Sequence, residues 1–295
     1  MKKKFLLSIA ILSVIGAMKC NAQGLETTVV QDLTEEHVFS QGIEGPAVDK
    51  AGNLYVVSFG KDGTIGIIKP GQKPELFIEL PKGSTGNGIR FNKAGEMFVA
   101  DYTGHNVLKI NMKTKAVSVF AHEEKMTQPN DIAMSPSGIL FASDPKWKDQ
   151  TGQLWRIDKK GTVTLLEGNM GTTNGVEVSP DGKKLYVNES IQRNVWVYDL
   201  DKKGNISNKK LLYKFEDGGM DGMRCDKVGN LYIARYGKGE VAVLSPSGAL
   251  IHTVKLKGKN PTNVTFGGPD RKTIYVTLQE RGAVEYFRNS SAGRE

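Results

Sequence analysis

Short runs of apolar residues recur along most of the chain and are separated by polar segments rich in glycine. The runs have the alternation and the bounding turn glycines of strands, not the spacing of helices in a helical repeat. Between Gly42 and Phe287 the same sequence pattern recurs with a period of a little over forty residues. Its apolar runs begin at Leu54, Met97, Leu140, Leu185, Leu231 and Ile274.

A tight turn precedes most of these runs, with a turn-forming side chain first and glycine last. The turns are Asp49–Gly52, Asn92–Gly95, Ser135–Gly138, Ser179–Gly182 and Asp226–Gly229. Such turns predict hairpins. We interpret their polar residues as turn formers and not as calcium loops, because no bidentate acid follows at the spacing of an EF-hand.

Repeats of this length with four strands each are typical of propeller blades. The sequence therefore predicts an all-β protein, a six-bladed β-propeller with four-stranded antiparallel blades, in a single domain over residues 23–295. The expected blades are approximately 43–80, 86–122, 129–168, 173–215, 220–256 and 261–287. We expect residues 36–40 to close the last blade as an N-terminal strand, which removes an exposed sheet edge. The tail Asn289–Glu295 is too polar to add a strand.

The first residues have the form of a secretory signal. Lys2, Lys3 and Lys4 precede an apolar run that is too short to span a bilayer, and small residues around Ala22 predict cleavage after it. Residues 1–22 are thus expected to be a signal peptide, and the protein secreted or periplasmic. Lipidation at Cys20 is the less favoured alternative, because bulky residues precede that cysteine.

Removing this leader lowers the net charge from the +8 of the full sequence. Four lysines leave with it, so 36 basic and 32 acidic residues remain, a net charge of +4. That balance gives no support to a nucleic-acid partner. Cys225 is then the only cysteine, which excludes an intrachain disulfide, and no other apolar stretch is long enough for a transmembrane helix.

Counting eight residues back from each hairpin glycine gives a residue with a side-chain oxygen every time. These residues, which we call the oxygen ring, are Glu44, Asn87, Asn130, Asn174 and Asp221, with Asn263 at the matching place in the sixth repeat. They open the innermost strands, which line the central channel of a propeller, so their side chains should converge on its axis.

We interpret part of this ring as a metal site. Glu44, Asn130, Asn174 and Asp221 offer the hard oxygen ligands that a divalent cation prefers, calcium above all. Magnesium, manganese and zinc stay open, although the lack of His and Cys disfavours zinc. Asp221 is the predicted catalytic residue, as base or nucleophile, and Glu44 the anchoring ligand. The alternative is that Asn-Gly and Asp-Gly are simply turn dipeptides.

Loops that join second to third strands should border the ring, and they are rich in basic and aromatic residues. They contain Phe59, Lys61, Tyr102, His105, Lys146, Trp147, Lys148, Arg193, Arg235, Tyr236 and Gln279. From these loops and the strand starts we predict six substrate-binding residues: Asn87, Tyr102, His105, Gln128, Trp147 and Arg235. The sequence has no G-x-S-x-G, H-E-x-x-H, Walker or G-x-G-x-x-G motif, which removes the usual support for serine hydrolase, zincin and nucleotide chemistry.

The repeats resemble the family of gluconolactonase, regucalcin (senescence marker protein) and luciferin-regenerating enzyme. The resemblance covers about Gly42 to Phe287, and its most specific pieces are Glu44–Pro46, Pro129–Asp131, Thr173–Val176 and Met220–Met223. It implies that Glu44, Asn130, Asn174 and Asp221 hold a catalytic divalent metal and that the aspartate is the general base that opens a lactone. Gln128 departs from the arginine of animal regucalcins, so the sugar contact made there does not carry over.

These inferences lead to one hypothesis and two alternatives. The hypothesis is a secreted, metal-dependent lactonase similar to gluconolactonase, acting on a small-molecule lactone with a calcium-type cation. The same metal ring would also suit a phosphotriesterase or arylesterase. The third candidate is a non-catalytic binding propeller with a structural ion.

Overall fold

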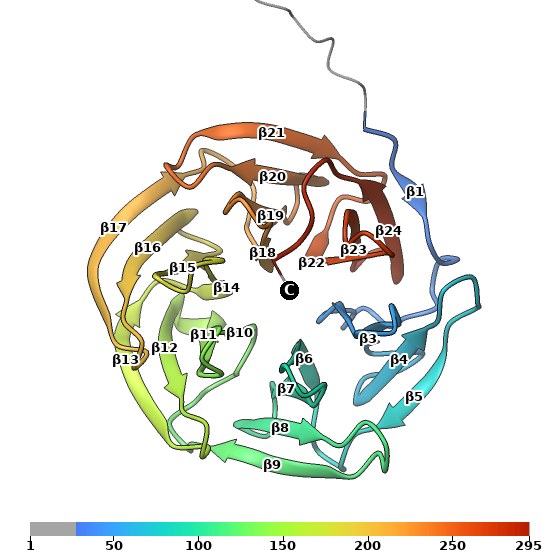
Figure 1. Ribbon diagram of the computed structural model, residues 1–295, viewed down its shortest axis with the longest axis horizontal. Helices are drawn as coiled ribbons and strands as arrows, with labels where there is room; N and C mark the ends of the chain where they lie inside the picture. The colour runs from blue at the N-terminus through green and yellow to red at the C-terminus, as the bar shows by residue number, and fades with distance from the viewer. Residues whose placement is uncertain (1–27, 295) are drawn as a thin grey trace, which may run out of the picture.

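The computed structural model describes residues 28–294, which form six four-stranded antiparallel sheets arranged in a ring (Figure 1). This confirms the predicted six-bladed propeller. The leader predicted at residues 1–22 lies outside the described residues. Within the described part of the chain, no helix has the length and apolar character needed to cross a membrane.

Each sheet is one blade, and in blades 1 to 5 the strands follow one another in the chain. Blade 1 contains β2 (Ala47–Val48), β3 (Leu54–Val57), β4 (Thr64–Ile68) and β5 (Glu75–Glu79). Blade 2 contains β6 (Gly86–Phe91), β7 (Met97–Asp101), β8 (Asn106–Ile110) and β9 (Val117–His122). Blade 3 contains β10 (Ile132–Met134), β11 (Leu140–Lys146), the short 3-10 helix η1 (Trp147–Asp149), β12 (Thr151–Ile157) and β13 (Val163–Met170).

The second half of the ring repeats the arrangement. Blade 4 contains β14 (Thr173–Val178), β15 (Lys184–Glu189), β16 (Asn194–Leu200) and β17 (Ile206–Lys214). Blade 5 contains β18 (Met223–Cys225), β19 (Leu231–Arg235), β20 (Glu240–Leu244) and β21 (Leu250–Lys255). Blade 6 contains β22 (Pro261–Gly267), β23 (Thr273–Leu278) and β24 (Ala283–Arg288), and β1 (Gln31–Asp32) from the N-terminal side completes it.

The closing strand lies earlier in the chain than predicted. β1 pairs with β24 through Gln31 and Asp32, so the assignment of this strand to residues 36–40 is wrong. His37 has a φ of 62°, which a continuous strand does not allow, and Phe39 bridges to Phe59 of blade 1. The apolar character at that point reflects burial of Phe39 between the first and last blades and not strand pairing.

The hairpin glycines adopt the conformation that the turn prediction requires. Gly52, Gly95, Gly138, Gly182 and Gly229 all have φ between 71° and 93°. Each donates its N–H to the first residue of its turn, as Gly52 does to the carbonyl of Asp49 at 3.1 Å. The five turns therefore hold the first two strands of their blades in a fixed register.

Apolar side chains fill the space between neighbouring blades. In one such cluster Tyr55 and Val57 of blade 1 pack with Ile89 and Val99 of blade 2, and equivalent clusters join the other blades. The inner strands then face the middle of the ring, where β2, β6, β10, β14, β18 and β22 surround the axis; Figure 1 labels all of them except β2. The fold thus brings the starts of six inner strands together around one point.

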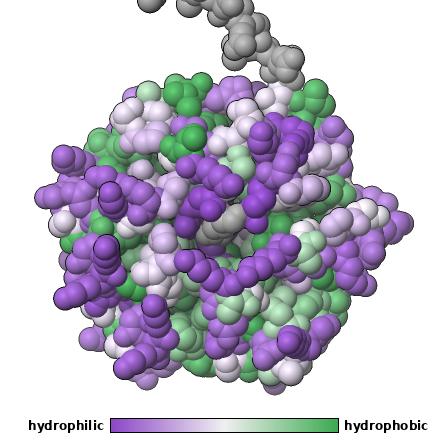
Figure 2. Space-filling model, viewed as in Figure 1, coloured by the Kyte–Doolittle hydropathy of each residue, from purple (hydrophilic) through white to green (hydrophobic). Residues whose placement is uncertain are grey.

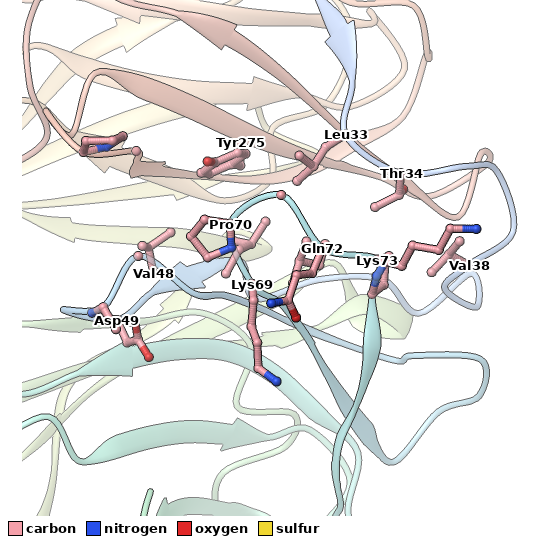
Figure 3. Close-up of a pocket in the computed structure, with 18 of the residues that line it drawn as sticks. Leu33, Thr34, Val38, Val48, Asp49, Lys69, Pro70, Gln72, Lys73 and Tyr275 are labelled. Atoms are coloured by element: carbon pink, nitrogen blue, oxygen red, sulfur yellow. Dashed lines mark hydrogen bonds between the residues drawn. The ribbon is translucent and has the colours of Figure 1, made fainter.

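A cavity of about 990 Å³ lies between blades 1 and 6, away from the axis. Figure 3 shows Leu33 and Val38 of the N-terminal segment on one side of it and Val48, Pro70 and Tyr275 from the two blades around it. No residue of the oxygen ring lines this cavity. It is therefore distinct from the candidate metal site.

Candidate metal centre

The structure brings four members of the oxygen ring into side-chain contact: Glu44 with Asp221 and Asn263, and Asn174 with Asp221. Asn87 and Asn130 lie near the starts of the neighbouring inner strands, and their convergence on the axis stays a prediction. Glu44, Asn87, Asn130 and Asn174 are at most 9% exposed, and Asn263 is fully buried. Asp221 keeps partial contact with solvent. The site is thus walled by protein but open at the aspartate.

Glu44 and Asp221 form a coupled pair of carboxyl groups. The two side chains hydrogen-bond each other, and Glu44 also accepts hydrogen bonds from the Gly45 N–H at 2.6 Å and from Asn263 Nδ2 at 2.9 Å. Burial, followed by the negative charge of Asp131, raises the pKa of Glu44 to about 7. Burial and the charge of Glu44 raise the pKa of Asp221 well above its ordinary range. Two carboxyls held this way favour a positive charge between them.

Asn174 supplies the observation that fits a cation best. Its side chain hydrogen-bonds Asp221, while its Oδ1 is buried and has no hydrogen-bond partner. A buried amide oxygen without a partner costs free energy unless something satisfies it. With the two carboxylates beside it, this oxygen belongs to a donor set that suits a hard divalent cation. The described residues contain no cluster of three or more His, Cys, Asp and Glu side chains that could hold a metal. A cation at the ring would therefore need amide oxygens as well as the two carboxylates.

Bulges at the starts of the inner strands aim several of these side chains. The pairing of β6 with β7 shifts between Gly86 and Ile89, and that of β14 with β15 shifts between Thr173 and Val176. Asn87 and Asn174 lie inside these irregularities. Bulges commonly redirect side chains at functional sites, and here they do so at two ring positions.

Three glycines that follow ring residues allow close packing of the inner strands, which disfavours the turn-dipeptide alternative at these positions. Gly45, which follows Glu44, differs from them and has a φ of 56°. Gly88, Gly175 and Gly222 do not have positive φ. A Cβ at Gly175 would lie 2.5 Å from the Asp221 carbonyl oxygen, and one at Gly222 would overlap the Asn263 side chain. Their missing side chains therefore let neighbouring inner strands approach each other at the ring.

Two asparagines hold the carboxylates in place. Asn188, in β15, donates from Nδ2 to the Asp221 carbonyl at 2.6 Å and accepts the Gly175 N–H at 3.2 Å. Asn263 donates to Glu44, as described above, and accepts the Val264 N–H at 2.9 Å. Counting back from the hairpin glycines identified Asn263 but not Asn188. That count locates the starts of the innermost strands, whereas Asn188 lies in the second strand of its blade.

A layer of buried charges lies behind the ring, and the sequence reasoning missed it. This charged layer consists of Arg90, Asp131, Glu177 and Arg224, all at most 4% exposed. Asp131 lies 3.4 Å from Arg90 and 3.6 Å from Arg224, and Glu177 lies 3.6 Å from Arg90. Arg90, Glu177 and Arg224 each follow a ring residue by three positions and stand between apolar neighbours. That spacing was the available signal.

Aromatic residues border the ring on two sides. Burial raises the pKa of Tyr102, the charge of Asp221 adds to that shift, and a hydrogen bond from Trp147 opposes it. Across the mouth, the Tyr236 hydroxyl donates to Gln279 Oε1, and Asp221 also acts on the pKa of that tyrosine after burial. Asp221 therefore acts electrostatically on one tyrosine of each pair.

The remaining predicted substrate residues are placed less directly. His105 has its Nδ1 against the Met126 carbonyl, and the Gln128 N–H donates to Asp144 at 2.6 Å. Arg235 is 1% exposed, stacks 3.6 Å above the Phe215 ring and pairs with Asp217 at 3.1 Å. These contacts give the Arg235 guanidinium a part in holding its own loop. A role of these residues in substrate binding stays a prediction.

Comparison with known proteins gives matches over most of the chain. The family profile described as SMP-30/Gluconolactonase/LRE-like region matches residues 44–280. Gluconolactonase of Zymomonas mobilis is 26% identical over 272 aligned positions, covering 80% of this chain and 76% of that protein. Diisopropyl-fluorophosphatase of Loligo vulgaris is 28% identical over 303 positions, covering 92% and 94%. The crystal structure of a calcium-binding protein, regucalcin, from Agrobacterium tumefaciens has a TM-score of 0.78 at 22% identity, covering 88% of this chain and 93% of that one.

Proposed function

The chain belongs to the SMP-30/gluconolactonase/LRE-like family, and from that premise we propose that it is a metal-dependent hydrolase that opens the ester bond of a sugar lactone. The proposal is supported by the relative named gluconolactonase, which aligns with most of both chains. Its second support is the site itself, where two carboxylates meet a buried amide oxygen.

The unpartnered Asn174 Oδ1 beside Glu44 and Asp221 carries the metal part of the proposal. Glu44, Asn130, Asn174 and Asp221 would hold the cation. Calcium is the ion we propose, because all four donors are hard oxygens and because the similar regucalcin is described as calcium-binding. When bound, the cation would polarise the lactone carbonyl and stabilise the charge that develops on its oxygen.

The protein's own groups then account for the proton transfers. Asp221 reaches solvent at the mouth and accepts a proton from a water molecule as that water attacks the carbonyl carbon. The ring C–O bond breaks, and the proton returns to the leaving oxygen, which gives the hydroxy acid. Asn188 fixes the backbone of Asp221 during this cycle.

The mouth suits a polyhydroxylated ring. Tyr102 and Trp147 offer aromatic faces on one side, and Tyr236 with Gln279 offers polar groups on the other. Aromatic faces stack on the apolar faces of sugar rings, while polar side chains take their hydroxyls. We therefore place the sugar between these two pairs.

A phosphotriesterase is the second candidate, and the likeness to diisopropyl-fluorophosphatase favours it. A substrate panel separates the two candidates. It compares the hydrolysis of aldono-1,4- and 1,5-lactones with that of phosphotriesters and aryl esters, and the release of protons measures each reaction. We expect kcat/KM to be at least about a hundredfold higher for the lactones. A higher value for phosphotriesters would replace the lactonase proposal, and no turnover in metal-loaded protein would favour the binding propeller.

Export through residues 1–22 remains part of the proposal. N-terminal sequencing of the protein recovered from the periplasm or the medium tests it. We expect the mature chain to begin at Gln23; a chain that still begins at Met1 would contradict export by cleavage.

A further inference from the structure

The residues after β24, Asn289–Arg294, which we call the C-terminal segment, run from the last blade to the middle of the ring (Figure 1). Backbone hydrogen bonds tie this segment to Lys227 at 2.8 Å, to Arg271 at 2.9 Å and to Cys225 at 3.2 Å. These partners belong to blades 5 and 6, at the hairpin-turn end of the channel. The segment therefore crosses the channel at the end opposite to the oxygen ring, and hydrophilic side chains gather around the middle of the face drawn in Figure 2.

Arg294 enters the channel and contacts three blades. Its side chain is 8% exposed. Its Nε donates to Glu177 Oε1 at 2.7 Å, its Nη2 donates to the Met134 carbonyl at 3.0 Å, and its backbone N–H donates to the Cys225 carbonyl at 3.2 Å. One residue thus links blades 3, 4 and 5 at their inner strands.

Three of the four proposed metal ligands lie in one of those strands or just before it. Met134 ends β10, which follows Asn130; Glu177 lies in β14 with Asn174; and Cys225 ends β18, which follows Asp221. β10 and β18 have only three residues each. A link at one end of such short strands restricts the separation of the side chains at the other end.

The charged layer provides a second connection between Arg294 and the ring. Glu177 pairs with Arg294 on one side and with Arg90 at 3.6 Å on the other. Arg90 in turn pairs with Asp131, which directly follows Asn130. Loss of the Arg294 charge would remove one cationic partner of Glu177, draw Glu177 more strongly toward Arg90 and so weaken the hold of Arg90 on Asp131.

We propose that Arg294 is a positioning residue for the metal site and that the C-terminal segment clamps β10, β14 and β18 so that Asn130, Asn174 and Asp221 keep the separation that a cation needs. Arg294 touches neither the cation nor the substrate. The inference rests on the proposed metal site, and its test therefore includes a measurement without metal.

The first measurement is calcium affinity, by calorimetric titration of the chelator-treated full chain. We expect Arg294→Met to weaken calcium binding by roughly three- to tenfold, because partners behind metal ligands commonly tune affinity on that scale. Arg294→Lys keeps the charge but loses the two-sided contact, and should lie between Arg294→Met and the wild type. The matched control is Arg288→Met, which removes an exposed ion pair with Asp270 and should leave affinity unchanged.

A double-mutant cycle tests the route through Glu177. If Arg294 acts through this carboxylate, Glu177→Gln combined with Arg294→Met should bind calcium about as well as Glu177→Gln alone. Fully additive losses would contradict that route. Wild-type affinity in Arg294→Met would overturn the whole inference.

The metal-free measurement uses Cys225, whose carbonyl accepts the Arg294 N–H and whose thiol is buried in the apolar cluster between blades 4 and 5. In a full chain carrying Cys20→Ser, a thiol reagent should modify Cys225 roughly tenfold faster in Gly293→Val, whose new side chain would collide with Phe266, than in the unaltered background. Equal rates would show that the segment does not restrain the end of β18, which would contradict the clamp. A wild-type protein that binds no calcium would defeat the proposed function, and the thiol rates would still report on the clamp.

Discussion

At the scale of single residues, the chemistry of the ring depends on the unequal surroundings of its two carboxyl groups. Glu44 receives hydrogen bonds from Gly45 and Asn263 and lies deep in the wall. Asp221 is held through its backbone by Asn188 and keeps contact with solvent. This difference supports Glu44 as the anchor and Asp221 as the base.

Asp221→Asn tests that division. The amide keeps the size and an oxygen for the cation but cannot accept a proton, so we expect kcat for lactone opening to fall by about 10²- to 10⁴-fold. Calcium binding should weaken far less. Lactone turnover and calcium titration on the same preparation measure both effects, with the exposed Asp201→Asn as control. Near wild-type turnover in Asp221→Asn would remove this residue from the mechanism.

Glu44 gives a pH-dependent prediction for the metal-free protein. Its pKa is about 7 in the folded chain against an ordinary value of 4.5. Between these pH values the folded protein keeps a proton that the unfolded chain has lost, so stability falls as pH rises through this window. From pH 5 to pH 8 in chelator, we expect the wild type to lose roughly 1 to 3 kcal/mol more unfolding free energy than Glu44→Gln.

Urea unfolding of both proteins at the two pH values measures this difference. The exposed Glu36→Gln should behave like the wild type, because Glu36 pairs with Arg281 away from the ring. Parallel pH profiles for the wild type and Glu44→Gln would show that the carboxyl has no raised pKa. Saturating calcium should remove most of the difference, since the cation replaces the proton.

At the scale of elements, the inner strands decide where the oxygens point. Counting back from the hairpin glycines located the oxygen ring. The inner strand and its turn together span the same number of residues in these blades, so each ring residue lies a constant number of residues before its glycine. The bulges at Asn87 and Asn174 could not be predicted, since they depend on pairing with β7 and β15 and on the close approach of the next blade. The closing strand was misplaced for a similar reason: Phe39 is apolar because of tertiary burial.

Gly222 tests the close approach of neighbouring inner strands. A methyl group there would collide with Asn263, which holds Glu44, so Gly222→Ala should lower stability by roughly 1 to 3 kcal/mol and weaken calcium binding. Gly168→Ala is the control, because the nearest atom to its Cβ would be Leu165 Cδ2 at 3.8 Å. Denaturation and calcium titration measure the pair; a Gly222→Ala variant as stable as the control would contradict the packing argument.

At the scale of the whole molecule, closure of the ring and filling of its channel come from both ends of the described chain. β1 completes blade 6, and Arg281 joins Asp32 of that strand to the buried Glu285 of β24. The C-terminal segment fills the far end of the channel. The period of the repeats predicted the ring of six blades. No local sequence pattern predicts that Arg294 pairs with Glu177, because the two residues are more than a hundred positions apart.

The pairing of buried charged residues could not be predicted from local sequence either. Arg90, Glu177 and Arg224 have polar side chains in apolar strands, and only the assembled ring shows that they neutralise one another behind the oxygens. Arg235 shows the reverse case: a basic residue predicted at the mouth is buried against Phe215. Sequence spacing identifies which positions face the axis, whereas pairing among them requires the three-dimensional arrangement.

The central claim is that the oxygen ring holds a catalytic cation, and lactone turnover before and after metal removal tests it most directly. Chelator-treated protein, shown to be metal-free by atomic emission, should open glucono-1,5-lactone no faster than the spontaneous reaction. Adding calcium should restore activity. The activity should saturate when one calcium ion is bound per chain, and the calcium concentration that gives half of it should match the dissociation constant from calcium titration. Full activity in the metal-free protein would contradict the account.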